Sequence, residues 1–309
     1  MSHELRKAGT GPSPAGRPLT IGAIAVMLLL CLSWGLNQVA IKLALPDIPP
    51  LTMATIRSAG GLMVVLLVAR LRGVDVFRRD GTLMAGIWAG VLFGLEFVVI
   101  YRGLVWTSAT RAVVFLYVAP FVVALGSFRL GERLGPSQWG GLALSFAGVV
   151  LAIGVPQAEV NATTLAGDVL VLAGGVLWAA TTLVVKLTPL LRAPAEKTLA
   201  YQLAVSIPIL GAGALLSGEQ VPAVPGPLAL MSLAYQTIWV VGLTFLFWFM
   251  LMRTYSASKL SAFTFITPLF GVAAGYFVLH DPLTLAFGGA AVLVIAGLFL
   301  VNRPQAQAA

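Results

Sequence analysis

Ten apolar stretches follow one another along the chain, each long enough to cross a lipid bilayer. A helix needs about 20 mostly apolar residues to span the hydrocarbon, and the stretches are separated by short segments that contain proline, glycine and charged residues. The pattern predicts an all-α polytopic membrane protein with ten transmembrane helices and no soluble domain. The predicted spans are 20–43, 50–70, 82–101, 105–128, 136–155, 165–187, 195–216, 227–252, 256–279 and 282–302.

Composition supports this class and argues against several others. The chain is 59% hydrophobic and 10% charged, and its mean hydropathy is +0.97. Its formal charge of +8 is spread between the apolar stretches, so we expect no nucleic-acid partner. Cys31 is the only cysteine and the two histidines are far apart, so we expect no metal and no cofactor. We find no phosphate-binding loop and no nucleophile–histidine–acid set, so we do not expect an enzyme.

Lysine and arginine residues are distributed unevenly between the two sides of the predicted bilayer. The side that would hold both chain ends carries 15 of the 19, which by the positive-inside rule predicts that both termini are cytoplasmic. We expect residues 1–19 to form a disordered cytoplasmic segment and residues 303–309 a short cytoplasmic tail. The four basic residues on the opposite side are Lys42, Arg57, Arg102 and Arg111.

A polar pattern recurs inside the apolar stretches at a fixed distance along the chain. A tryptophan is followed by two polar residues at the third and fourth positions and by a lysine at the eighth, and the set returns 144 residues later. The tryptophan and the two polar residues share one helix face, which suggests the wall of a cavity. The first set is Trp34, Asn37, Gln38 and Lys42, and the second is Trp178, Thr181, Thr182 and Lys186.

The repetition indicates two copies of one unit. Pro120 also matches Pro268, at an offset of 148, so the register drifts only at loops. The predicted repeats, 20–155 and 165–302, hold five spans each, and an odd number forces the second copy to insert upside down. We therefore predict two inverted five-helix repeats around a central cavity, with the substrate site near the middle of the bilayer.

Three short motifs and the ten-span layout resemble one known group of proteins. The motifs are Ser-Trp-Gly at 33–35, Leu-Gly-Glu-Arg-Leu at 130–134 and its counterpart Leu-His-Asp-Pro-Leu at 279–283. Over about residues 20–302 the chain resembles the drug/metabolite transporter superfamily with two EamA-type domains. Within it, the chain is most similar to the YddG-type exporters of aromatic amino acids. This resemblance implies a multi-pass protein of the bacterial inner membrane that exports amino acids or similar metabolites.

We therefore expect a secondary transporter that works by alternating access, with aromatic amino acids as the first substrates to test. A passive channel or facilitator is one alternative, and a transporter of sugars, nucleosides or drugs with the same fold is another. A non-transporting scaffold would not need matched polar residues inside its spans. Protons are the candidate coupling ion. The sequence leaves open a monomer or a weak homodimer, and the lipid bilayer and a small molecule are the expected partners.

Polar and aromatic residues inside the predicted spans are the candidates for substrate binding. Aromatic rings can stack on a planar substrate, and an amino-acid carboxylate needs a cation or amide donors, for which Asn37, Gln38 and Lys259 are candidates. Hydrogen bonding between helices is the alternative role for the polar groups. The full candidate set is Trp34, Asn37, Gln38, Tyr101, Trp178, Thr181, Thr182, Tyr235, Gln236, Trp239, Lys259 and Phe263.

Glu96 is a carboxylate deep inside a predicted span. A charge at the bilayer centre costs about 2.5 kcal/mol or more, so we expect Glu96 to be neutral or paired, with Arg57 or Arg111 as partner. Glu96, Arg57 and Arg111 are the candidates for an outer gate or a proton-coupling site, and a structural ion pair is the alternative.

Prolines and glycines predict where helices bend and touch. Pro120 and Pro268 lack a backbone donor in mid-span, so we expect kinks there that serve as rocking hinges or as static bends. Gly86, Gly90 and Gly94 recur every fourth residue, which favours close helix packing. The fifth and tenth spans carry few polar residues, so we place them at the periphery.

Overall fold

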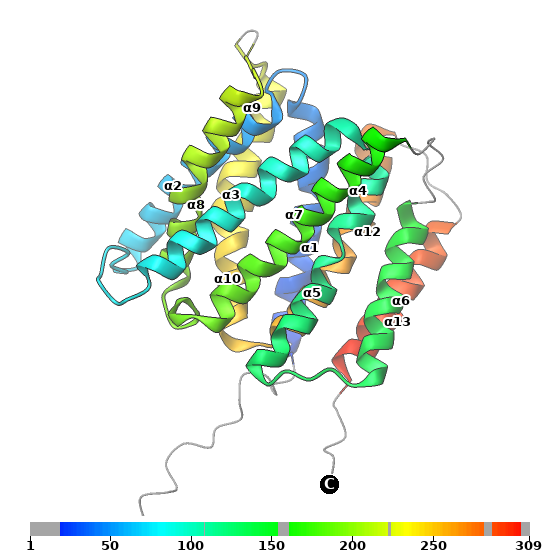
Figure 1. The fold of residues 1–309 in the computed structure, drawn as a ribbon. Coiled ribbons are helices and arrows are strands. Elements are labelled where there is room, and N and C mark those ends of the chain that lie inside the picture. Colours follow the sequence, from blue (N-terminus) through cyan, green and yellow to red (C-terminus); the bar gives the residue numbers. More distant parts are fainter. Residues whose placement is uncertain (1–18, 108, 154–160, 222–223, 281–285, 304–309) are drawn as a thin grey trace, which may run out of the picture.

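The computed structural model describes residues 19–107, 109–153, 161–221, 224–280 and 286–303, and within these ranges it contains helices, turns and no β-strand (Figure 1). The elements in chain order are α1 (Ile21–Ala44), α2 (Pro50–Leu71), α3 (Leu83–Trp106), α4 (Ala109–Leu116), α5 (Ala119–Gly126), the 3-10 helix η2 (Ser127–Leu130), α6 (Pro136–Ile153), α7 (Ala162–Leu187), the 3-10 helix η3 (Pro189–Leu191), α8 (Ala195–Leu216), α9 (Pro227–Ala234), the π-helix η4 (Tyr235–Thr244), α10 (Phe245–Thr254), α11 (Ala257–Phe263), the 3-10 helix η5 (Thr264–Ile266), α12 (Thr267–Ala274), the π-helix η6 (Gly275–Leu279) and α13 (Ala286–Asn302).

Nine segments of the described chain are long and apolar enough to cross a membrane, and they coincide with the first nine predicted spans. The tenth predicted span corresponds to α13, an apolar helix of 17 residues. Residues 281–285, which complete the predicted turn at 279–283, lie outside the described ranges. The nine segments are Ile21–Ala44, Pro50–Leu71, Leu83–Trp106, Arg111–Leu130, Pro136–Ile153, Ala162–Leu187, Ala195–Leu216, Pro227–Thr254 and Ala257–Leu279.

Both ends of the described chain lie at the same end of the helix bundle. α1 begins and α13 ends at the bottom of Figure 1, and we call this the terminal end. The opposite end, where α1 stops and α7 starts, is the far end. The placement of the terminal end in the cytoplasm stays a prediction.

Two spans are interrupted at the predicted prolines. α4 stops at Leu116, and Pro120 lies in the first turn of α5, where its missing N–H needs no partner. Pro268 lies in the first turn of α12, after the single 3-10 turn η5. The predicted irregularities are therefore present at both sites, and their role as hinges stays a prediction.

The three glycines spaced by four on α3 form a flat surface for α8. A Cβ atom added at Gly90 would lie 2.5 Å from the Cβ of Val205, and one added at Gly86 would lie 2.3 Å from the ring of Tyr201. Real Cβ atoms do not come this close, so only glycine permits this approach of the two helices. The predicted packing role of these glycines is confirmed.

The start of α8 is tied to the loop between α2 and α3 at the terminal end. The Lys197 ammonium is almost fully buried and lies 2.8 Å from Asp80 Oδ2, and Arg72 pairs with buried Glu196 at 2.5 Å. Hydrogen bonds from Lys197 and Thr82 lower the pKa of Asp80 to about 2. The Asp80 carboxylate therefore stays ionised throughout the physiological pH range.

Helices α6 and α13 lie side by side at one edge of the bundle (Figure 1). Their backbones cross closely at glycines, since a Cβ atom added at Gly297 would lie 2.5 Å from the Gly141 carbonyl oxygen and 2.3 Å from Ser145 Oγ. This edge position agrees with the periphery that we predicted for the fifth and tenth spans.

The crossing predicts that Gly297→Ala lowers the free energy of unfolding by about 1–2 kcal/mol, because the new methyl group meets rigid backbone. The thermal midpoint of the purified protein in detergent measures this. Gly288→Ala on the same helix is the matched control, since nothing lies within 4 Å of its added Cβ. Equal midpoints for the two variants would contradict a tight crossing.

Candidate functional site

The first repeated tryptophan joins α1 to the π-helix η4 in the interior. Trp34 Nε1 donates a hydrogen bond to Thr244 Oγ1 at 2.9 Å, and this fully buried hydroxyl donates in turn to the Val240 carbonyl at 2.6 Å. The Trp34 ring packs edge-on against Phe245 and Trp248, at centroid distances of 6.1 and 5.7 Å. Trp34 is therefore an interior residue and not part of an interfacial aromatic belt.

The π-helix carries three further candidates, and two of them form hydrogen bonds with α1. The Tyr235 hydroxyl donates to the Ser33 carbonyl at 3.0 Å, and Trp239 Nε1 donates to Ser33 Oγ at 2.9 Å. Gln236, the next residue after Tyr235, is fully buried and has no hydrogen-bond partner at either amide atom among the described residues. Wide helical turns of this kind are frequent at functional sites, and the hydrophobic pattern gave no indication of this one.

The second repeated tryptophan lies in a different environment. The Trp178 ring meets Tyr117 edge-on at 6.2 Å, and Tyr117 in turn contacts Phe265 at 6.0 Å. The hydroxyls of Thr181 and Thr182 donate to backbone carbonyls one turn earlier, at 2.9 and 3.2 Å. Because these protons are used within α7, the two threonines can offer a ligand only acceptor lone pairs.

The hydrogen bond between Trp34 and Thr244 can be tested by itself. Trp34→Phe keeps an aromatic ring beside Phe245 but removes the donor, so we expect stability to fall by about 1 kcal/mol. Trp88→Phe is the matched control, because Trp88 is 58% exposed on α3. The midpoint of thermal unfolding in detergent is the measurement, and an unchanged midpoint for Trp34→Phe would show that the bond adds nothing.

The charged residues Arg57 and Glu96 are both buried, but they form no ion pair. Their exposed fractions are 3% and 7%, and Arg57 Nε and Glu96 Oε2 have no hydrogen-bond partner within the described ranges. The two charges lie within electrostatic reach of each other. The Arg57 guanidinium stacks over Phe97 at 4.4 Å from the ring centroid. The predicted pairing of Glu96 with an arginine is therefore not formed in this structure.

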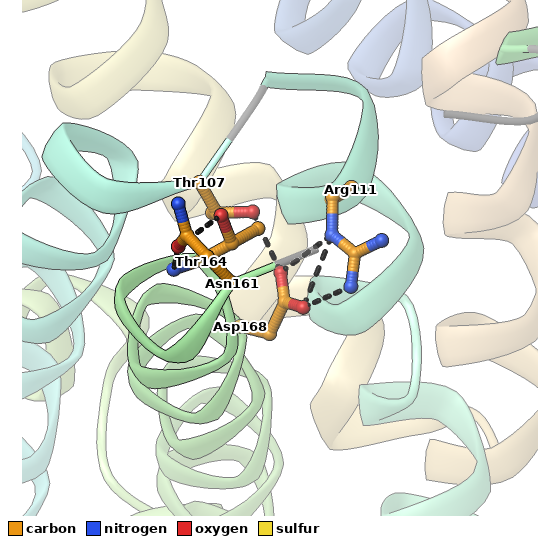
Figure 2. Close-up of polar contacts among 5 residues, drawn as sticks. All are labelled: Thr107, Arg111, Asn161, Thr164 and Asp168. Atoms are coloured by element: carbon orange, nitrogen blue, oxygen red, sulfur yellow. Dashed lines mark hydrogen bonds and ion pairs between the residues drawn. The ribbon is translucent and has the colours of Figure 1, made fainter. Parts of the chain in front are cut away.

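Arg111 pairs instead with Asp168, at the far end (Figure 2). Arg111 Nε lies 3.1 Å from both carboxylate oxygens, a guanidinium nitrogen also donates to Oδ2, and Thr107 Oγ1 donates to Oδ1 at 2.6 Å. Two turns earlier, Asn161 accepts a hydrogen bond from Thr164 N at 2.8 Å and caps α7. The cluster joins the end of α3, the start of α4 and the start of α7. The sequence pattern did not indicate Asp168, because it lies near the end of a span, where polar residues are common.

Glu132 connects the two halves of the chain at the terminal end. This carboxylate lies in the loop before α6, is 7% exposed, and accepts hydrogen bonds from the backbone N–H groups of Ala257 and Ser258, at 3.1 and 3.2 Å. It also accepts from the hydroxyls of Ser256 and Ser258, at 2.7 and 2.9 Å. It therefore caps α11, as an anion at a helix N-terminus does.

The remaining candidates are spread over the bundle. Lys259 lies half-buried in the first turn of α11, where its charge interacts with Glu132. Gln38 is exposed on α1, and Tyr101 is half-buried beside Phe97 at 6.1 Å. Phe263 is buried, and its carbonyl accepts from Cys31 Sγ at 3.3 Å. The structure thus brings together candidates from α1 and η4, and it leaves Gln38 and Lys259 apart from them.

Two apolar grooves are found on the outer surface. One, of about 480 Å³, follows the exposed face of α13, and the other, of about 470 Å³, lies between α2 and the α9–η4 segment. Lipid chains would cover both. The predicted central cavity stays a prediction, and the described residues hold no cluster of three or more metal-ligating side chains.

Comparison with known proteins identifies the class. The model of the EamA-like transporter family matches residues 21–154 and 165–303. An uncharacterized transporter of Archaeoglobus fulgidus is 27% identical and covers 91% of this chain and 98% of its own length. Probable amino-acid metabolite efflux pumps of Salmonella typhimurium and Escherichia coli are 29% and 28% identical, and each alignment covers 88% of this chain and 92% of the relative.

A solved crystal structure is similar to this protein in fold, and the likeness extends to nothing beyond the fold. Its TM-score is 0.77 at 20% sequence identity, and the match covers 90% of this chain and 96% of that one. The apolar helices, the interior polar contacts and the two family matches agree with one another. The chain therefore belongs to the EamA-like transporter family and is a multi-pass membrane protein with two EamA-like regions.

Proposed function

We propose that this protein is a secondary transporter that exports amino acids, aromatic ones foremost, and similar small metabolites across the bacterial inner membrane. The observation that carries the proposal is the interior position of the two repeated tryptophans. Trp34 and Trp178 lie on the first helix of each family region, and each contacts aromatic rings from other helices. The two relatives named as amino-acid metabolite efflux pumps support the substrate class.

Alternating access between two inverted halves is the mechanism that we propose. The helix contacts support it. The first helix of one repeat, α1, packs on the α9–α10 segment, and the first helix of the other, α7, packs on α3. In the same way α2 packs on α8, and α6 packs on α13. A two-fold axis in the membrane plane would produce such matching pairs. In this mechanism Pro120 and Pro268 act as hinges, the Arg111 cluster acts as a gate at the far end, and both termini are cytoplasmic.

Substrate binding is assigned to the interior face where α1 meets η4. Trp34, Tyr235 and Trp239 form hydrogen bonds between these two elements and supply the aromatic surface. Asn37 and Gln236, on the same two elements, have buried amide atoms without a partner among the described residues. A small amphipathic solute needs both, because rings stack on its apolar part and amides bind its polar part.

Uptake into proteoliposomes tests the proposal. We expect saturable uptake of labelled phenylalanine or tryptophan that unlabelled aromatic amino acids compete, with runs in the presence and absence of a proton gradient. Trp34→Ala should reduce uptake by about tenfold or more, because a lost aromatic contact is worth about 1.5 kcal/mol. Trp88→Ala, which removes an exposed tryptophan on α3, should leave it unchanged.

Three outcomes would redirect the assignment. Uptake no greater than in empty liposomes for every amino acid would overturn the substrate class and bring sugars, nucleosides and drugs forward. Uptake without saturation or counterflow would indicate a passive facilitator. Wild-type uptake by the Trp34→Ala and Trp178→Ala variants would show that the repeated tryptophans are not part of the substrate site.

A further inference from the structure

Four buried side chains in one part of the bundle have polar atoms without a hydrogen-bond partner among the residues that the structure describes. They are Asn37 Oδ1 on α1, Arg57 Nε on α2, Glu96 Oε2 on α3, and both amide atoms of Gln236 on η4. All four residues are more than nine-tenths buried, at exposures between 0% and 7%. Buried polar atoms nearly always have partners, so this concentration points to a ligand that the four side chains are arranged to meet.

The four residues lie between the middle of the bundle and the far end. Arg57 is in the second turn of α2, Asn37 is in the last third of α1, and Gln236 is the second residue of η4. α2 and η4 are in direct contact beside them, because a Cβ atom added at Gly60 would lie 2.5 Å from Thr237 Cγ2. Glu96 is just beyond the middle of α3, within electrostatic reach of Arg57.

The unsatisfied atoms are of two chemical kinds. Glu96, Asn37 and Gln236 present oxygen atoms, and Arg57 and the Gln236 amide nitrogen present donors, one of them cationic. The unpaired, buried Glu96 carboxyl is neutral by itself and ionises when a cation lies beside it. A ligand that carries an ammonium group and a carboxylate group side by side complements both kinds. A ligand with one charge would form only one of these two charge pairs, and a cationic ligand would also leave the buried Arg57 charge without a partner, which is costly in a low-dielectric interior.

We infer that Glu96 binds the ammonium group and Arg57 the carboxylate group of an α-amino-acid zwitterion, with Asn37 and Gln236 completing the hydrogen bonds. The inference rests on the proposed function and deepens it by naming which atoms of the substrate are recognised. The stacking of Arg57 on Phe97 leaves its planar donor edge available for a carboxylate.

A row of aromatic rings leads from this charged pair to Trp34. Phe97 contacts Phe93 at 5.1 Å, Phe93 contacts Phe245 at 6.1 Å, and Phe245 contacts Trp34 at 6.1 Å. A substrate whose charged end lies at Arg57 and Glu96 would lay its side chain along this row. An aromatic side chain gains most from such a surface, which accounts for the proposed preference.

Competition with single-charge analogues tests the inference. Uptake of labelled phenylalanine is competed with unlabelled phenylalanine, with N-acetylphenylalanine, which lacks the ammonium group, and with phenethylamine, which lacks the carboxylate. For the wild-type protein we expect each analogue to compete about 10- to 100-fold more weakly than phenylalanine, because each forms only one of the two charge pairs.

The charge-removing variants should relax this discrimination selectively. We call the ratio by which phenylalanine competes more strongly than an analogue the gap for that analogue. Glu96→Gln should narrow the gap for N-acetylphenylalanine by about tenfold and leave the gap for phenethylamine unchanged. Arg57→Gln should narrow the gap for phenethylamine and leave the gap for N-acetylphenylalanine unchanged. Arg102→Gln is the control, because it removes an exposed cation from α3 and should leave both gaps as in the wild type. If either variant does not purify as a monodisperse protein, Glu96→Asp and Arg57→Lys replace it and should keep the zwitterion preference at weaker affinity.

A thermal-shift titration with the same three compounds separates failure of this inference from failure of the proposed function. Stabilisation by phenylalanine but not by its analogues, without any uptake, would support the binding site and overturn transport of amino acids. Uptake of phenylalanine with the same gaps in every variant would overturn the inference and leave the proposed function standing. Loss of the response to a proton gradient in Glu96→Gln, with unchanged gaps, would make Glu96 a proton site and also overturn the inference. No uptake and no stabilisation by phenylalanine would overturn both.

Discussion

Replacing Glu132 with alanine should lower the free energy of unfolding by about 3–5 kcal/mol, the cost of removing one partner from a buried charged network. The change leaves two backbone N–H groups and two serine hydroxyls at the start of α11 without their acceptor. Lys186 and Lys259, whose charges interact with Glu132, would also lose their counter-ion. The thermal midpoint of the purified protein in detergent should fall by many degrees.

Glu219→Ala is the matched comparison. Glu219 also caps a helix, since its carboxylate accepts from the N–H groups of Leu51 and Thr52 at 3.1 and 2.7 Å, but it is only half-buried. Its removal should therefore cost about 1 kcal/mol, the usual value for an accessible cap. Equal losses for the two variants would show that burial of Glu132 adds nothing to its stabilising effect.

Asp168→Ala should lower stability by about 3 kcal/mol, because it removes the carboxylate that accepts hydrogen bonds from both the Arg111 guanidinium and the Thr107 hydroxyl. Arg111→Ala should cost a similar amount, since it leaves a carboxylate that is 5% exposed. The loss of stability in the double variant should be much smaller than the sum of the two single losses. In each single variant the loss comes mostly from the remaining residue, whose partner has been removed. Thermal midpoints of the four proteins complete the cycle, and additive losses would contradict a coupled pair.

The sequence was sufficient to predict the nine candidate membrane spans of the described chain, and the tenth stays a prediction. Each apolar stretch is long because the hydrocarbon requires it, so the signal is local and independent of neighbours. The interior position of Trp34 and the breaks near Pro120 and Pro268 were also predictable, because a mid-span polar face and a missing donor act within a single helix.

The partners of the charged groups could not be predicted in the same way. Arg111 was expected near Glu96 but pairs with Asp168, and Glu132 was known only as part of a turn motif although it caps a helix 124 residues away. Such contacts depend on how distant helices align. The π-helix also escaped prediction, because one wide turn changes which residues share a face without changing the composition of the span.

Mechanical stiffness is distributed unevenly along this chain. α1, α2, α3 and α7 run for 22 to 26 residues without an interior proline. By contrast, α8 contains Pro208, and the spans made of α4–α5, α9–α10 and α11–α12 change helix type or stop part way. An unbroken helix resists bending with its whole ladder of hydrogen bonds, and an interrupted one has fewer bonds to strain. Any large change of shape should therefore be absorbed by the three interrupted spans and by α8 near Pro208, while α1, α2, α3 and α7 move as rods. A spectroscopic label on a rod would then record displacement, and a label beside an interruption would record bending.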